Sequence, residues 1–267
     1  MQDGTMNYKW NAGDYAKHSA GQERWARELL PLLELRADDR VLDIGCGDGR
    51  ITAAIAQQVP DGSVVGIDSS ADMVAHAKDL ARGTPNLSFE QRDAAQLGFN
   101  EQFTAIFSNA TLHWIRDQAR VVDQIARALR PSGRVLVQCG GQGNGQGAID
   151  SFMRVARRDS WHKSFENFES TYGFYSPSEY EVWLERAGLR TDELRLIPKD
   201  MIHADRNAFE GWVRTAWHPY TAPVPESKRA RFIQEVTEDY LQSFPADASG
   251  QIHVTMIRLQ FRAHKPA

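Results

Sequence analysis

Residues 41–49, with the sequence VLDIGCGDG, decide the fold of this chain. The first four are typical of a buried strand, and three glycines then alternate with other residues in a short turn. Gly45, Gly47 and Gly49 can adopt positive φ angles and leave no Cβ in the way of a small molecule, although three glycines alone are as often only a tight connection. Residues 51–59 have the pattern of a helix, so the stretch predicts a strand, a ligand-binding turn and a helix.

A second strand, at residues 63–67, is followed at once by Asp68. In an open α/β sheet, this position presents a carboxylate to the two hydroxyls of a ribose. Asp68 could instead cap the next helix, but Ser69 and Ser70 are better placed for that role. The G-x-G-x-G spacing lacks the run that lays a helix against a pyrophosphate, which disfavours NAD. The pattern therefore predicts a site for a nucleoside without phosphates, and S-adenosylmethionine is the common ligand of that kind.

Composition bounds the remaining possibilities. The chain has 267 residues, 42% hydrophobic and 25% charged, with a net charge of −4 and a sequence pI near 6.1. Scattered Lys and Arg residues argue against binding to nucleic acid or to an anionic membrane, and no apolar stretch approaches the ~18 residues of a membrane span. Two cysteines, Cys46 and Cys139, are too few for a disulfide framework or a zinc cluster. We expect one cytoplasmic domain over residues 1–267 that binds no metal and is a monomer or weak homodimer.

Residues 40–139 alternate short apolar segments with amphipathic ones, which is typical of β-α-β units around a parallel sheet. Strands are expected at 40–44, 63–67, 87–91, 103–108 and 134–138, and helices at 51–59, 71–82 and 117–129. Pro131-Ser132-Gly133 should end the last of these helices, and the glycine-rich run 140–147 should be a flexible connection. Ligands of such sheets bind at the carboxyl ends of the strands.

The rest of the chain has a different pattern. Helical spacing with many aromatics is present at 149–168 and 205–244, a capped helix at 176–188, and strand-like alternation at 193–197 and 253–261. The fold class is therefore α/β: a doubly wound, mostly parallel seven-stranded sheet with helical cap insertions. We assign residues 1–35 to an N-terminal helix or lid, 36–139 to the cofactor-binding core, 140–250 to a substrate cap and 251–267 to the final strand.

Three motifs resemble the class I S-adenosylmethionine-dependent methyltransferases. They are VLDIGCGDG at 41–49, GIDSS at 66–70 and IFSNATLHWI at 106–115. The last of these, with YAKHSAGQERWARELL at 15–30 and GQIHVTMIRLQFRAHK at 250–265, is similar to the narrower group around trans-aconitate methyltransferase. TLHWIRDQ at 111–118 also resembles the juvenile-hormone acid methyltransferases of insects. Both groups esterify a carboxylate.

The resemblance implies a cofactor site made by the glycine turn and by the ends of the neighbouring strands. Its residues are Asp43, Gly45, Cys46, Gly47, Asp68, Ser69, Met73, Asp93, Ala94, Asn109 and Ala110. Asp43 and the turn would line the methionine part of S-adenosylmethionine, Asp68 would bind the ribose hydroxyls, and Asp93 would face the adenine amino group. Alternatively, Asp93 is a solvated loop acid and Met73 fills a gap in the core.

On the acceptor side, the resemblance implies that His113 and Trp114 lie where the methyl group meets its acceptor. Two further segments would contribute residues to the same cleft. The N-terminal segment supplies Tyr15, His18, Gln22 and Trp25 as a lid, and the helical insertion supplies Trp212, Arg214, Trp217 and Tyr220. Arg214 is the residue expected to clamp a substrate carboxylate, because a guanidinium offers a planar pair of donors. The alternative is a surface arginine on a solvated helix face.

Several chemistries stay open. Residues 108–111 are Ser-Asn-Ala-Thr, where many DNA and protein amino-group methyltransferases have Asn-Pro-Pro-aromatic, and this disfavours methylation of a base or an amide. A carboxylate acceptor is already ionised at pH 7 and needs no base, whereas a hydroxyl would need one, and His113 is either that base or a positioning donor. The sequence thus predicts a small-molecule methyltransferase, with a carboxylate as the leading acceptor. The alternatives are transfer to another oxygen, nitrogen or carbon, or a non-catalytic protein that only binds the cofactor.

Overall fold

The computed structural model describes residues 20–267 and, within its first helix, side chains from Trp25 onward. Its centre is a seven-stranded sheet in the order β3-β2-β1-β4-β5-β7-β6. The strands are β1 (Arg40–Ile44), β2 (Ser63–Asp68), β3 (Leu87–Gln91), β4 (Phe103–Asn109), β5 (Leu129–Gly140), β6 (Arg190–His203) and β7 (Ile252–His264). The first five strands pair in parallel, and β7 runs antiparallel to both β5 and β6. The doubly wound, mostly parallel α/β fold expected from the sequence is confirmed.

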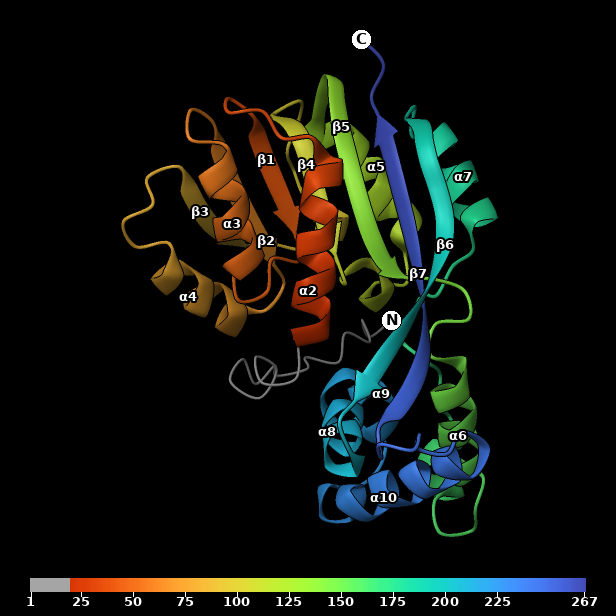
Figure 1. The fold of residues 1–267 in the computed structure, drawn as a ribbon. Helices are drawn as coiled ribbons and strands as arrows, with labels where there is room; N and C mark the ends of the chain where they lie inside the picture. Colours follow the sequence, from red (N-terminus) through yellow and green to blue (C-terminus); the bar gives the residue numbers. More distant parts are fainter. Residues whose placement is uncertain (1–19) are drawn as a thin grey trace.

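Helices cover both faces of this sheet (Figure 1). One face carries α2 (Ala20–Leu29), α3 (Arg50–Gln58) and α4 (Ala71–Leu80), and the other carries α5 (Gln118–Ala128) and α7 (Pro177–Arg186). Each layer buries its own apolar cluster against the strands, because parallel strands in such a sheet are apolar on both sides. The order of β1, β2 and β4 places the carboxyl ends of these strands side by side at one edge.

Local sequence signals determine where several helices begin. Ser70 caps α4 by accepting a hydrogen bond from the backbone N–H of Met73 at 3.3 Å. Ser176 and Glu179 form a reciprocal capping box at the start of α7, with Pro177 in the first turn, as the sequence predicted. The helix expected at 117–129 ends at Ala128, three residues before Pro131, and residues 130–133 already belong to β5, whose pairing with β4 is irregular there.

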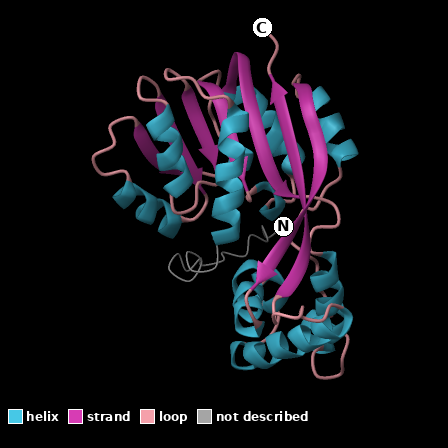
Figure 2. Ribbon diagram, viewed as in Figure 1, coloured by secondary structure: helices cyan, strands magenta, loops and turns pink. Residues whose placement is uncertain are grey.

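A second group of helices and strands lies beyond the edge of the sheet (Figures 1 and 2). The strands β6 and β7 continue past the ends of their neighbours as a two-stranded ribbon, from the pair Pro198 and Ile257 to the pair His203 and Ile252. Helices pack around this ribbon, namely α6 (Gln146–Ala156), α8 (Arg206–Ala216), α9 (His218–Thr221) and α10 (Glu226–Ser243). We call these helices and the ribbon the cap.

The cap has its own aromatic core, which includes Phe152, Phe209 and Phe232. The structure divides the segment 140–250, which the sequence analysis assigned as a whole to a substrate cap. Helix α7 and the first half of β6 belong with the sheet, because Tyr180 and Leu184 of α7 pack in the main core. Strand β6 is also longer than the expected 193–197, since an edge strand with polar residues shows no clear apolar alternation.

Candidate active site

The glycine turn after β1 is fixed by two backbone hydrogen bonds. The N–H groups of Gly45 and Cys46 both donate to the carbonyl of Ile67, at 2.8 and 2.9 Å. Gly45, Gly47 and Gly49 all have positive φ, as the sequence predicted. Their missing Cβ atoms serve different purposes, however, and this corrects the simple expectation that all three admit a ligand.

A Cβ on Gly45 would stand 2.0 Å from the Oγ1 of Thr111, and one on Gly49 would stand 2.7 Å from the ring of Phe89. These two glycines are therefore required by packing within the protein. At Gly47, no heavy atom lies within 4 Å of the Cβ position, so the space there is open. Gly47 is the glycine over which a ligand can approach the backbone.

Asp68 faces the same turn from the end of β2. One carboxylate oxygen accepts from the N–H of Gly47 at 3.0 Å, and the other accepts from the N–H of Ser70 at 2.9 Å. Burial raises the pKa of Asp68, which these backbone donors oppose. The two donors hold the carboxylate in one orientation beside the open space, and each oxygen retains a lone pair for a hydroxyl donor.

Asp43 lies beneath the turn and is fully enclosed. Its Oδ2 accepts a hydrogen bond of 2.6 Å from the hydroxyl of Thr52. Burial, with the nearby charge of Asp68, raises the pKa of Asp43 to about 7, although the Thr52 hydrogen bond lowers it. Burial likewise raises the pKa of the Cys46 thiol, so this cysteine is a neutral packing residue of the turn.

The expected adenine side lies at the ends of β2 and β3. Asp93 is exposed and follows β3, and its Oδ1 accepts from the N–H of Ala95 at 2.8 Å, which caps a short 3-10 helix. Met73 and Ala94 are buried, whereas Ser69 is exposed. The open space at Gly47, the oriented carboxylate of Asp68 and the acid at the end of the next strand fit the methionine, ribose and adenine parts of S-adenosylmethionine.

The loop after β4 is attached directly to the glycine turn. The side chain of Thr111 fills the position of the absent Gly45 Cβ, and its hydroxyl lies 3.3 Å from the Gly45 carbonyl oxygen. Ala110 has a left-handed φ of 56°, and its N–H donates to the carbonyl of Gln138 at 2.8 Å. This turn directs the chain from Asn109, at the end of β4, into the 3-10 helix that holds His113 and Trp114.

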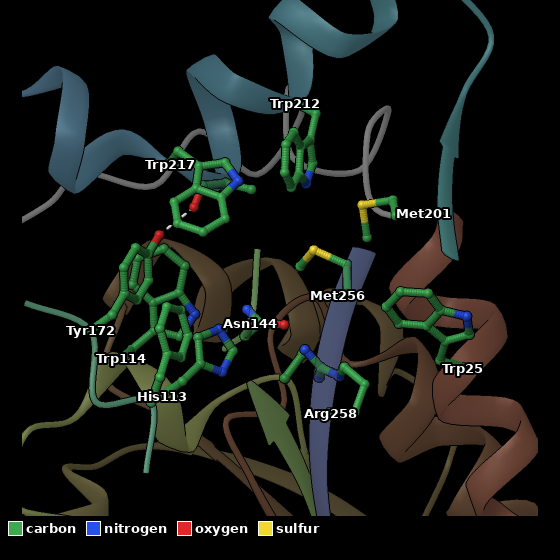
Figure 3. Close-up of a pocket in the computed structure, with 13 residues that line it drawn as sticks. Trp25, His113, Trp114, Asn144, Tyr172, Met201, Trp212, Trp217, Met256 and Arg258 are labelled. Carbon is green, nitrogen blue, oxygen red and sulfur yellow. Dashed lines mark hydrogen bonds between the residues drawn. The ribbon is translucent and has the colours of Figure 1, made fainter. Parts of the chain in front are cut away.

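A pocket lies between this loop, the cap and α2 (Figure 3). Its space amounts to about 510 Å³, the part open to solvent included. The side nearest the sheet is formed by Ala110, His113, Trp114 and Arg258. The loop before α6 contributes Asn144, the loop before α7 contributes Tyr172 and Phe174, and α2 contributes Trp25. The cap contributes Met201, Trp212, Ala216, Trp217 and Met256.

His113 is buried in this wall and is held by the chain around it. The backbone N–H of Gly140 donates to its Nδ1 at 3.2 Å, and its ring stacks on Phe174 with 5.9 Å between centroids. Burial and the neighbouring charge of Arg258 place the pKa of His113 well below its usual value, so the ring is neutral. With Nδ1 accepting a hydrogen bond, the proton of the neutral ring is assigned to Nε2.

Arg258 is the charged group of the pocket. It stands on β7, opposite Gly140 of β5 and Ile197 of β6, and only 3% of its surface is exposed. Its guanidinium lies over the ring of Trp25, 5.6 Å from the centroid. Its neighbour Gly140 has no room for a side chain, because a Cβ there would stand 2.7 Å from the ring of Phe174 and 2.9 Å from the side chain of Asn144.

The structure brings some of the expected acceptor-side residues together and separates others. Trp25, His113, Trp114, Trp212 and Trp217 line the pocket. Two expected residues are not among the described residues that line it. Arg214 is exposed on α8, and Tyr220 is buried in the cap core against Phe152. Tyr15 and His18 lie outside the described residues, as does the side chain of Gln22.

Sequence analysis missed Arg258 although a signal was present. Along β7, the buried positions 252, 254 and 256 carry Ile, Val and Met, and the next position with the same period is Arg258. An arginine on the buried face of a strand is rare unless it is paired or functional. Asn144 was missed because the glycine-rich run around it was taken as a flexible connection, yet its Oδ1 accepts from the N–H of Ile257 at 3.1 Å.

Among residues 20–267, no three His, Cys, Asp or Glu side chains are grouped so that they could hold a metal ion. None of the helices in that part of the chain is both long and apolar enough to cross a membrane.

Comparison with known sequences gives a consistent result. A family model described as a methyltransferase domain matches residues 41–133. The trans-aconitate 2-methyltransferase of Methylobacterium nodulans is 30% identical, over 94% of this chain and 96% of the relative. The trans-aconitate 2-methyltransferase of Deinococcus radiodurans is 29% identical, over 96% of this chain and 98% of the relative.

Solved structures are similar in fold. The YcgJ protein of Bacillus subtilis matches with a TM-score of 0.62 at 20% identity, covering 92% of this chain and 99% of its own. Phosphoethanolamine N-methyltransferase 2 of Haemonchus contortus, solved with phosphomonomethylethanolamine and S-adenosylhomocysteine, matches with a TM-score of 0.62 at 18% identity. That match covers 99% of this chain and 59% of the other.

The two glycines can be separated by mutation. Gly45→Ala forces a Cβ into Thr111 as well as a strained left-handed alanine, so unfolding in urea should show a loss of roughly 2–5 kcal/mol. Gly47→Ala carries the backbone strain alone, about 1–2 kcal/mol, but projects a methyl into the open space. Calorimetry should show that Gly47→Ala weakens S-adenosylhomocysteine binding at least tenfold. Equal stability losses in the two variants, or full affinity in Gly47→Ala, would contradict these separate roles.

Asp43 should make stability depend on pH. Because its folded-state pKa is raised to about 7, the folded chain binds this proton more tightly than the unfolded chain does. The contribution is therefore present below about pH 4 and is lost as the pH rises through about 7. Urea unfolding across this range should show that Asp43→Asn gains stability relative to wild type as the pH rises. The exposed Asp61→Asn is the matched control for the replacement of an aspartate by an asparagine.

Proposed function

Because the chain belongs to the class I S-adenosylmethionine-dependent methyltransferases, in the group of the trans-aconitate 2-methyltransferases, we propose that it methylates a carboxylate oxygen of a small organic acid. Its relatives support its being an S-adenosylmethionine-dependent methyltransferase of a small molecule. When bound, the cofactor supplies an electrophilic methyl group on a sulfonium sulfur. Gly47 and Asp68 would hold its methionine and ribose parts, and Asp93 would face the adenine.

The observation that carries the proposal is the charge of the pocket. Arg258 is a buried cation, and no Asp or Glu is among the described residues that line the pocket with it. A buried guanidinium in a dry, aromatic site attracts an anion strongly, and its fork of donors matches a carboxylate. A protonated amine would meet repulsion from Arg258 and no compensating carboxylate in this lining.

His113 supports the same acceptor. Its Nδ1 already accepts from Gly140, and burial together with Arg258 opposes protonation, so its pKa is well below the usual range. A general base for a hydroxyl acceptor needs a lone pair directed at the acceptor and a pKa near the working pH. The neutral ring offers an Nε2–H donor instead. We therefore assign His113 a positioning role, as a hydrogen-bond donor to the acceptor.

In this mechanism, the protein aligns the reactants and excludes water. Methyl transfer is an in-line displacement, so an ionised carboxylate needs only to be held with one oxygen on the axis of the breaking bond. Arg258 holds the carboxylate, while Trp114 and the other aromatic walls keep water out. The attachment of Thr111 to Gly45 fixes the acceptor side relative to the cofactor side.

The alternatives have less support. Transfer to nitrogen is the activity in the name of the Haemonchus contortus neighbour, but an identity of 18% shows a common fold alone. Transfer to a hydroxyl lacks a base in the geometry of His113. A non-catalytic binding protein is disfavoured by the whole-length similarity to curated methyltransferases.

The bond formed can be tested directly. The enzyme should be incubated with methyl-labelled S-adenosylmethionine and panels of organic acids, phenols and amines. If a carboxylate is the acceptor, mild alkali will release the transferred label as volatile methanol, because methyl esters hydrolyse under conditions that leave methyl ethers and N-methyl groups intact. Label that resists alkali would reject the proposed acceptor atom.

The cation can be tested with a matched pair of substitutions. Arg258→Met should raise the KM for an accepted acid at least tenfold, as expected for charge-assisted hydrogen bonds of ~1.5–3 kcal/mol, and should leave cofactor affinity unchanged. Arg258→Lys, which keeps the charge but not the fork, should lie between Arg258→Met and wild type. Arg214→Met is the control, since this arginine is exposed and outside the pocket.

The three variants also separate binding from folding. Urea unfolding and cofactor calorimetry will show whether each variant keeps its fold and its cofactor site. If folded Arg258→Met has wild-type kinetics, Arg258 does not clamp the substrate. If Arg214→Met has the larger effect, the original assignment from the sequence is restored.

A further inference from the structure

We propose that the acceptor is a flat monocarboxylic acid that carries a neutral hydrogen-bond acceptor, such as an ether or carbonyl oxygen, at the end opposite its carboxylate. This inference rests on the proposed carboxylate methylation and goes beyond it by defining the body of the substrate. It also separates this chain from the relatives whose names specify trans-aconitate, which is a tricarboxylic acid.

The positive charge of the pocket limits the number of carboxylates that a substrate can carry. Arg258 is the single cationic side chain among the described residues of the pocket, since His113 is neutral. Lys199 also approaches the ring of Trp25, at 5.9 Å, but it pairs with Glu28 at 2.7 Å and does not line the pocket. One guanidinium balances one carboxylate. A second or third carboxylate would be buried in this lining without a partner, which is costly.

The walls of the pocket are mainly aromatic and apolar. Tyr172 and Phe174 stack with an angle of 13° and 5.1 Å between centroids, and the ring of His113 lies at 26° to Phe174. These three rings form one wall, in which no two ring planes are inclined by more than 31°. Met201 and Met256 lie between Trp25 and Trp212 in Figure 3, and their thioethers are adaptable and apolar. Such walls favour a planar, unsaturated or aromatic body over a polar, branched one.

Among the described residues, the pocket also has a buried donor that lacks an acceptor, the indole N–H of Trp217. Trp217 is 2% exposed, lines the pocket, and its Nε1 has no hydrogen-bond partner among the described residues. Figure 3 shows this nitrogen directed into the space on the side of Trp212, across the pocket from Arg258. A buried donor without an acceptor is unfavourable, and an indole N–H can only donate. A substrate oxygen at this position would satisfy it.

Trp217 is held rigidly enough to select for such an oxygen. Its ring packs edge-on against Tyr172, whose hydroxyl donates to the carbonyl of Ala216. Gly145, with a φ of +63°, admits the ring, since a Cβ there would stand 2.6 Å from it. The donor therefore cannot turn away to find another partner, and the substrate must supply one.

Four acids test the inference with the full-length enzyme and S-adenosylmethionine. They are cinnamate, 4-methoxycinnamate, 4-carboxycinnamate and trans-aconitate. We expect kcat/KM to be highest for 4-methoxycinnamate, about five- to tenfold above cinnamate, as one neutral hydrogen bond allows. The two polycarboxylates should fall at least tenfold below cinnamate.

Trp217→Phe provides the internal control. It should remove the preference for 4-methoxycinnamate over cinnamate, and the ratio of the two kcat/KM values within the same variant cancels any general loss of activity. Preference for 4-carboxycinnamate or trans-aconitate, equal loss for both monocarboxylates in Trp217→Phe, or methylation of none of the four acids would overturn the inference. Alkali-labile products formed from polycarboxylates alone would reject this inference and keep the proposed function, whereas alkali-stable products would reject the proposed function itself.

Discussion

The pairing of β6 with β7 is the interaction on which the rest of the site depends. These strands are paired from Arg190 and His264, within the sheet, to His203 and Ile252, within the cap. The cap helices pack on the far end of this ribbon, so the cap is held to the sheet by a continuous hydrogen-bonded ladder as well as by loops. Arg258 stands where the ribbon leaves the sheet, with backbone on both sides. A cation at this junction belongs to a rigid element, which suits a group that must hold a substrate in one orientation.

The other constraint is the contact between Gly45 and Thr111. It joins the turn that is expected to hold the cofactor to the loop that carries His113 and Trp114. Because a Cβ cannot be accommodated at Gly45, the side chain of Thr111 packs directly against the backbone of the glycine turn. Methyl transfer is sensitive to small displacements along the reaction axis, so direct packing between donor and acceptor loops is more effective than a connection through a flexible segment.

The cofactor half of the site could be predicted because it is local in sequence. The strand, glycine turn and acid of residues 41–68 have fixed spacings, and the parallel order of the strands brings their ends together. The acceptor half is assembled from α2, the loop before α7, the cap and β7, and no spacing joins these segments.

Arg214 illustrates the difficulty, because it lies between Trp212 and Trp217 in sequence. A helix turns about 100° per residue, so Arg214 is rotated roughly 200° from Trp212 and faces away from the pocket. The two-residue period of β7 places Arg258 on the same buried face as Ile252, Val254 and Met256. That period would have identified Arg258 from the sequence.

Selectivity in such a pocket is set by its few polar groups. Apolar walls discriminate between substrates mainly by shape, whereas a buried polar group left without a partner disfavours a substrate that cannot satisfy it. Arg258 and the indole N–H of Trp217 are on opposite sides of this pocket, with aromatic and thioether side chains between them. The aromatic lining therefore determines which substrate skeletons fit, while Arg258 and Trp217 determine where the substrate must have an oxygen atom. The donor character of His113 adds to this requirement, because a base at that position would have opened the site to hydroxyl acceptors. A pocket with only donors directed at an anion needs no proton transfer, and the chemistry is then controlled by alignment alone.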